Sequence, residues 1–180
     1  LHPALVAERA ARLAVVAERA AAACDGSPRY VIGTEVPVPG GESAGEHGIH
    51  VSTAADVEET IDVTRVAFEA AGVAAAWDRV RAVVAQPGVE CSDAELFRSS
   101  PGQAAHLGDV ARAASGVVFE AHSTDYQSLT SLRGLVDDHF AILKVGPGLT
   151  FAYRESVYAL SFIEDELLGE RASGVREVLD

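Results

Sequence analysis

Hydrophobic residues along the chain fall into two alternating patterns. Four short runs are mostly apolar, which is typical of strands buried on both faces of a parallel sheet. The predicted strands cover residues 30–33, 80–85, 117–121 and 140–145. Between them, apolar residues recur at helical spacing. The predicted helices are 4–23, a helix from Thr53 to Gly72, a short piece around Trp77, a weak pattern over 101–114, and 127–138, 150–168 and 173–179.

Capping and turn residues support the helix boundaries. Pro3 suits the first turn of the first helix, because its missing N–H would have no partner there. Thr53 and Asp56 have the spacing of a capping box, and Gly72 ends that helix. In the first helix we expect a single apolar face, made by Leu5, Val6, Leu13 and Val16.

The order of elements predicts an α/β fold in a single domain over residues 1–180, with no internal linker. A helix is followed by four strand–helix units, which gives parallel strands covered by helices. Such a sheet is either open and doubly wound or part of a TIM-type (β/α)8 barrel. Gly33, Gly40 and Gly41 lack the dinucleotide-binding Gly-x-Gly-x-x-Gly spacing, and no Walker phosphate loop is present. The spacing of the strand starts is close to that of barrel units, so we favour a partial barrel of four units.

The composition limits the classes of binding partner and the cellular compartment that we expect. With 14 Lys and Arg against 27 Asp and Glu, the net charge is −13, which argues against nucleic acid or an anionic membrane as a partner. No run reaches the ~18 apolar residues of a membrane span. Cys24 and Cys91 form no disulfide framework, and Glu8, Arg9 and Arg12 stand where a secretory signal needs an apolar core. We therefore expect a cytoplasmic protein.

Polar residues collect after the predicted strands, at the edge where barrels and open sheets carry their sites. After the successive strands, the candidates are Glu35, then Gln86, then Glu120, His122, Ser123 and Asp125, then Lys144 and Gly146. Alternation along a strand puts Glu120 and His122 on one face, and Ile142 and Lys144 on one face. If these faces point into a barrel, a carboxylate, an imidazole and an ammonium lie close together. The alternative is a Glu120–Lys144 ion pair that fills the barrel interior and does no chemistry.

Several chemistries fit these residues and stay open. His122 is a candidate zinc ligand, with carboxylates to complete the set, although the spacing of a metal motif is absent. Lys144 is the single lysine and a candidate for a Schiff base with a carbonyl substrate. Ser123 faces away from His122 on an extended strand, which disfavours nucleophilic catalysis. The backbone around Gly146, where the next helix begins, is a candidate phosphate site or a simple turn.

Four long motifs follow the same order as the strands. They are residues 30–42 (YVIGTEVPVPGGE), 84–90 (VAQPGVE), 119–127 (FEAHSTDYQ) and 139–147 (HFAILKVGP). Together they resemble the GatZ/KbaZ family, the non-catalytic subunits of class II D-tagatose-1,6-bisphosphate aldolase. The resemblance implies a TIM barrel, a role in galactitol, N-acetylgalactosamine or tagatose catabolism, and a catalytic class II aldolase subunit as the partner that this subunit stabilises. Family members are much longer, so the chain resembles the second, C-terminal half of their barrel.

The resemblance also bears on the candidate site residues. Zinc-dependent class II aldolases carry a His-Gly motif where Gln86 stands here, and a second ligand histidine that His122 matches. They have Lys-Val-Asn where this chain has Lys144, Val145 and Gly146. Glu35 corresponds to an acidic loop residue in those enzymes. With one zinc ligand and the Asn replaced, the implied role is accessory and without independent catalysis. Gln86, Ser123, Asp125 and Gly146 are then candidates for binding a sugar phosphate.

An enzyme in its own right is the alternative function. It would act on a phosphorylated ketose, with Glu35, Glu120 and Lys144 as catalytic candidates. It would be an aldolase-type lyase or a tagatose-6-phosphate kinase, a label that the family has carried, although no ATP-phosphate loop is present. A half barrel leaves two open sheet edges, which proteins rarely leave uncovered. We therefore expect this chain alone to form homo-oligomers, to aggregate or to require the other half of the barrel.

Overall fold

The computed structural model describes residues 2–33, 49, 51–91, 96–114 and 116–179. The chain divides into two compact units, Leu1–Lys144 and Val145–Asp180. The first unit contains the sheet and all the candidate site residues of the described ranges except Gly146. Each unit is described by itself below.

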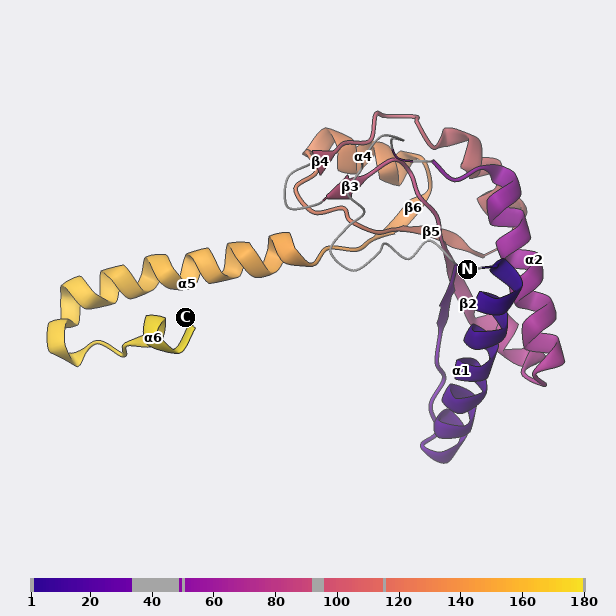
Figure 1. The fold of residues 1–180 in the computed structure, drawn as a ribbon, viewed down its shortest axis with the longest axis horizontal. Coiled ribbons are helices and arrows are strands. Elements are labelled where there is room, and N and C mark those ends of the chain that lie inside the picture. Colours follow the sequence, from indigo (N-terminus) through magenta and orange to yellow (C-terminus); the bar gives the residue numbers. More distant parts are fainter. Residues whose placement is uncertain (1, 34–48, 50, 92–95, 115, 180) are drawn as a thin grey trace. The chain divides into compact units, whose positions relative to one another are not determined.

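A four-stranded sheet forms the centre of the first unit (Figure 1). Its strands are β1 (Tyr30–Ile32), β2 (Val80–Val84), β5 (Val118–Ala121) and β6 (Phe140–Leu143). The strand order is β1-β2-β5-β6, and every neighbouring pair is parallel. All four predicted strands and their parallel arrangement are confirmed.

Helices and a small hairpin-like pair complete the first unit. The helices are α1 (Pro3–Ala23), α2 (Ala54–Ala70), η1 (Ala74–Arg79), η2 (Ala105–Leu107), α3 (Gly108–Ala113) and α4 (Leu129–Asp137). The predicted capping box of α2 is present, since Thr53 Oγ1 accepts from the Asp56 N–H and Asp56 accepts from the Thr53 N–H. The short antiparallel strands β3 (Glu90–Cys91) and β4 (Leu96–Phe97) were not predicted.

The two faces of the sheet differ in how they are covered. One row of paired residues crosses all four strands and joins a core that includes residues of α1 to α4. This row consists of Ile32, Val83, Phe119 and Phe140, each no more than 4% exposed. The opposite face carries Val31, Ala82, Val84, Val118, Glu120 and Ile142, none of which belongs to that core. A parallel sheet with helices packed on one face is consistent with a segment of an α/β-barrel wall, whose interior side is the second row.

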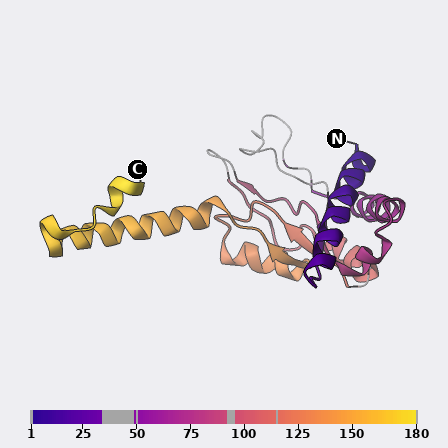
Figure 2. The same cartoon turned by 90° about the horizontal axis from the view of Figure 1, so that it is seen from below.

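The predicted apolar face of α1 is wrong. Helix α1 lies beside α2 (Figures 1 and 2) and buries small residues, namely Ala7, Ala11 and Ala14. The larger predicted residues point elsewhere: Leu5 is 38%, Leu13 71% and Val16 62% exposed. Alanines allow the two helix backbones to approach closely, so packing selected the alanine stripe over the larger side chains.

Glu18 ties the end of α1 to the sheet. Its Oε1 accepts hydrogen bonds from the Tyr30 hydroxyl and from Arg79 Nη2, the latter at 2.5 Å. The hydrogen bond from Tyr30 and then that from Arg79 lower the pKa of Glu18, against an opposing effect of burial. Burial and the contact with Glu18 raise the pKa of Tyr30. The fold therefore favours the ionised carboxylate over the protonated one.

We expect the stability conferred by Glu18 to depend on pH. Because the folded pKa of Glu18 is lowered, its contribution is present above the unfolded pKa and is lost as pH falls through the folded pKa. Glu18→Gln should therefore melt below the wild type at neutral pH, and the gap should narrow on acidification. Thermal melts across that range measure the gap, and Glu8→Gln, an exposed position on the same helix, should follow the wild type. A gap that stays constant with pH would contradict this role.

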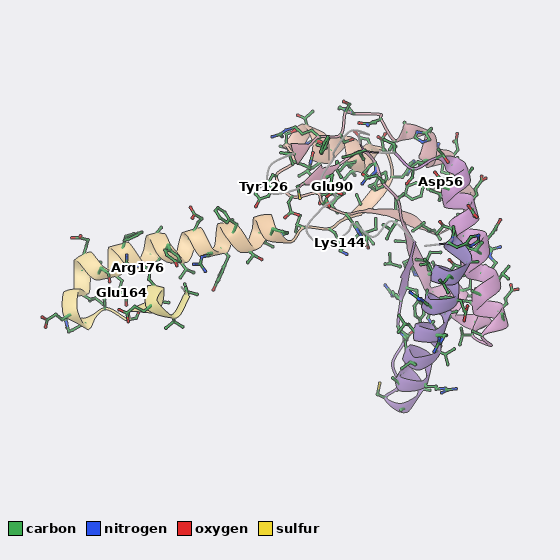
Figure 3. The ribbon with its side chains drawn as sticks, in the orientation of Figure 1. Asp56, Glu90, Tyr126, Lys144, Glu164 and Arg176 are labelled. Atoms are coloured by element: carbon green, nitrogen blue, oxygen red, sulfur yellow. The ribbon has the colours of Figure 1, made fainter. Side chains whose placement is uncertain are left out.

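The second unit is a long helix with a short one packed on it. It contains α5 (Pro147–Leu168), η3 (Gly169–Arg171) and α6 (Val175–Leu179). Arg176 of α6 is labelled in Figure 3. It pairs with Asp165 and lies over the Phe162 ring at 4.4 Å. Helix α5 begins three residues before the predicted start, because Pro147 occupies its first turn, a position that proline favours. In the described ranges, no helix combines the length and apolar character that crossing a bilayer demands.

Candidate functional site

Glu120, His122 and Lys144 form a cluster at the carboxyl end of the sheet. Glu120 lies on β5, and His122 follows that strand on the same face; Lys144 directly follows β6 (Figure 3). His122 Nε2 is 3.0 Å from Glu120 Oε1, and Lys144 Nζ is 3.4 Å from His122 Nε2 and 4.0 Å from Glu120 Oε1. The alternation of the two strands thus brings together the three groups as the sequence predicted.

Backbone hydrogen bonds fix the strand ends that carry this cluster. The Lys144 N–H donates to Ala121 O at 2.9 Å, and the Thr124 N–H donates to Lys144 O at 3.2 Å. The Thr124 hydroxyl donates to the same carbonyl at 2.8 Å. Thr124 is 2% exposed and positions the backbone of Lys144. Sequence reasoning assigned no role to Thr124, because its partner, Lys144, follows another strand.

The contact with an ionised Glu120 favours one tautomer of a neutral His122 ring. A carboxylate can only accept, so the Nε2 atom beside Glu120 must carry a proton. That Nε2 then has no lone pair for Lys144, and the ammonium is attracted to the Glu120 carboxylate instead. Nδ1 is the acceptor of the neutral ring, and no hydrogen bond within the described residues reaches it.

Exposure differs sharply across the cluster. The side chains of Glu120 and His122 are 10% and 15% exposed, whereas that of Lys144 is 58% exposed. A nearly buried carboxylate is costly unless it is paired, and here it has both an N–H donor and a nearby ammonium. The cluster therefore presents a largely buried imidazole and a solvent-accessible cation on the face of the sheet opposite the core row.

The side chain of Gln86 forms hydrogen bonds within its own turn. Its Oε1 accepts from the Gly88 N–H at 2.9 Å and from the Val89 N–H at 3.0 Å. The backbone of Gln86 is held by Ser52, whose Oγ accepts from the Gln86 N–H at 2.8 Å. The carbonyl end of the side chain thus stabilises the loop after β2, a role that depends on backbone geometry and gave no signal in the sequence.

Ser123 and Asp125 lie in the turn after β5. Ser123 adopts a positive φ of 52°, and the described residues show no hydrogen bond between it and His122. Asp125 is 5% exposed and lies near Cys91, whose thiol the sequence did not associate with this region. Burial raises the pKa of Cys91, and the charges of Asp125 and Glu90 add to that effect.

Gly146 and Glu35 are the remaining predicted site residues. Gly146 precedes α5 in the second unit, where its carbonyl accepts from the Leu149 and Thr150 N–H groups. The phosphate role suggested for it stays a prediction. Glu35 lies outside the described residues.

The donors at the cluster bear on whether it could hold a zinc ion. A catalytic zinc site takes three protein ligands. Within the described residues, no group of three His, Cys, Asp or Glu side chains is arranged to hold a metal ion. In the part of the chain that the structure describes, the ligand type beside His122 is Glu120, whose carboxylate contacts its Nε2. The described donor set therefore does not fit zinc.

The fold and the cluster define a mixed α/β protein with a parallel sheet and a polar site at the strand ends. The chain belongs to the D-tagatose-1,6-bisphosphate aldolase subunit GatZ/KbaZ-like family, whose pattern matches residues 1–180. The family membership predicted from the four motifs is thereby confirmed.

Two individual proteins show how far the likeness extends. The chain is 48% identical over 184 residues to the D-tagatose-1,6-bisphosphate aldolase subunit GatZ of Klebsiella pneumoniae, covering all of this chain and 43% of that protein. The crystal structure of a probable tagatose 6-phosphate kinase from Sinorhizobium meliloti is 45% identical, with a TM-score of 0.74 over 93% of this chain and 39% of that one. The chain thus spans less than half the length of both relatives.

Proposed function

We propose that this chain is part of an accessory subunit that stabilises the catalytic subunit of a class II tagatose-1,6-bisphosphate aldolase. The observation that carries the proposal is the 48% identity, over the whole chain, to a protein named as the GatZ subunit of that enzyme. In this proposal, the rest of the full-length protein completes the four strands to a TIM barrel and covers the edge strands β1 and β6. The row of the sheet opposite the helical core would then face the barrel interior.

The site geometry supports an accessory role over independent class II cleavage. Such cleavage requires a zinc ion to polarise the substrate carbonyl. The described donor set does not fit that ion, and the Gln86 side chain is occupied within its own loop. The catalytic metal would accordingly be supplied by the partner subunit.

A kinase is the second candidate function, because the relative from Sinorhizobium meliloti is called a probable tagatose 6-phosphate kinase. The sequence offers it less support, since no Walker phosphate loop is present. Both candidates belong to carbohydrate metabolism and share a phosphorylated sugar as the ligand expected at the polar strand ends.

The stabilising role predicts a longer lifetime for the catalytic subunit. We expect that subunit, incubated at raised temperature with the full-length protein, to keep its aldolase activity several-fold longer than it does alone, because a partner that binds only the folded state stabilises it. The measurement is the half-life of activity, with an unrelated protein at equal concentration as the control. Equal half-lives with and without the full-length protein would refute the role.

A further inference from the structure

An apolar groove lies between helices α1 and α2, away from the strand-end cluster. Its volume is about 500 Å³, and its apolar lining consists of Ala4, Ala11, Val63, Val66, Ala67, Ala70 and Ala71. Val66 is 63% exposed. Three charged residues, Glu8, Arg12 and Asp62, also line the groove, and all three are exposed. An apolar depression with charged residues around it is typical of a surface that binds another protein.

The apolar surface continues from the groove along α1. Leu5, Glu8, Arg12 and Val16 follow one another at intervals of three or four residues, so they lie on one face of the helix. Leu5 is 38% and Val16 62% exposed. The core of the first unit uses the alanines of α1 and leaves these two larger residues at the surface. They lie on the same face as two residues that line the groove.

The exposed charges of the two helices have opposite signs. On α1 the exposed charged residues are Glu8, Arg9, Arg12 and Arg19, so this helix presents a net positive surface. On α2 they are Asp56, Glu58, Glu59, Asp62, Arg65 and Glu69, so that helix presents a net negative surface. A partner that covers both helices must therefore offer negative charge to α1 and positive charge to α2.

We propose that the groove binds a second copy of this protein, with a two-fold axis that runs along the groove. Such an axis places α1 of each copy over α2 of the other, because it exchanges the two sides of the groove. The positive helix then faces the negative one at both contacts, and the exposed apolar residues of the two copies cover each other. A uniformly acidic or basic partner would match only one of the two helices. The inference goes beyond the accessory role and does not depend on it.

The pair of helices is large enough for a stable dimer. Helix α1 has 21 residues and α2 has 17, which correspond to lengths of roughly 30 and 25 Å. Packed side by side about 10 Å apart, they present a face on the order of 500 Å² in flat projection. The accessible area of such a face exceeds its projection, which brings it near the ~800 Å² that each partner of a standard interface buries.

Completion of the barrel would leave the groove open. Helices α1 and α2 already lie side by side (Figures 1 and 2). In a barrel the helices form an outer ring, so helices supplied by the rest of the full-length protein extend this ring beyond α1. They do not enter the outer surface between two helices that are already neighbours.

The mass of the full-length protein in solution tests the inference. We expect a dimer by light scattering coupled to gel filtration. Val66→Glu should raise the dissociation constant of the dimer at least about 10²-fold, because a two-fold interface buries the new charge twice. Val136→Glu is the matched control, since Val136 is a similarly exposed valine on α4, and it should dimerise like the wild type. A monomeric wild type, or a dimer that persists in Val66→Glu, would overturn the inference.

Charge reversal tests which helices meet. Arg12→Glu and Asp62→Arg should each weaken the dimer about tenfold or more, because each places like charges opposite one another. When the two variants are mixed, they should form mixed dimers that are tighter than the dimer of either variant alone. In the mixed dimer, each introduced charge faces the opposite charge. This recovery also shows that both variants are folded, and its absence would contradict the pairing of α1 with α2.

The same variants distinguish the other occupants of the groove. If a segment of the same protein filled it, Val66→Glu would lower the melting temperature of a protein whose mass does not change. If the catalytic aldolase subunit filled it, the full-length protein would be monomeric alone and Val66→Glu would abolish binding of that subunit. Either result would overturn the assignment of the groove to a second copy.

Discussion

Replacing Phe119 with alanine is expected to lower the free energy of unfolding by about 3–5 kcal/mol. Phe119 is 1% exposed and stands in the middle of the row that crosses all four strands. Its ring lies 5.2 Å from that of Phe140, which is fully buried. Truncation would leave a cavity between β5 and the helices that the surrounding backbone can only partly close. Chemical denaturation of the full-length protein measures the loss.

Val136 on α4 is the matched control for this prediction. It is apolar like Phe119 but is 56% exposed. Val136→Ala should change the free energy of unfolding by no more than about 0.5 kcal/mol. Similar losses at Phe119 and Val136 would show that the row on the sheet is not the core of the first unit.

Gly33→Ala is expected to cost about 2–6 kcal/mol, from backbone strain and overpacking together. Gly33 follows β1 and has a φ of 144°, a backbone conformation that L residues with a side chain rarely adopt. A Cβ atom there would lie 2.8 Å from Val84 Cβ and 2.9 Å from Val84 N on the neighbouring strand. Since Val84 N belongs to the backbone of β2, relief of the clash requires the strands β1 and β2 to separate.

Gly72→Ala serves as the control that separates backbone strain from overpacking. Gly72 also has a positive φ, of 75°, but a Cβ there would meet no atom within 4 Å. Gly72→Ala should therefore show backbone strain alone, about 1–2 kcal/mol. If Gly72→Ala were as destabilising as Gly33→Ala in denaturation experiments, close approach of β1 to Val84 would not be the cause.

Local patterns were sufficient to predict much of the first unit. The four strands follow from continuous apolar runs, and the start of α2 follows from the spacing of Thr53 and Asp56, which interact within one turn. The proximity of Glu120, His122 and Lys144 could also be predicted, because it depends only on side-chain alternation along two adjacent parallel strands. These features require no knowledge of side-chain packing.

Features that depend on packing could not be predicted in this way. The periodicity of α1 indicates both an alanine stripe and a stripe of larger residues, and only contact with α2 decides which is buried. The pairing of β3 with β4 involves two residues on each strand, too few for a pattern. The engagement of Gln86 with the N–H groups of Gly88 and Val89 depends on loop geometry that no spacing encodes.

Cleavage of tagatose 1,6-bisphosphate tests the accessory role most directly. The assay compares the full-length protein alone, the catalytic class II subunit alone and the mixture of both. The account predicts no cleavage by the full-length protein alone, and activity in the mixture that is higher or longer-lived than that of the catalytic subunit. Cleavage by the full-length protein alone, abolished by His122→Gln, would contradict the accessory role and establish an independent enzyme.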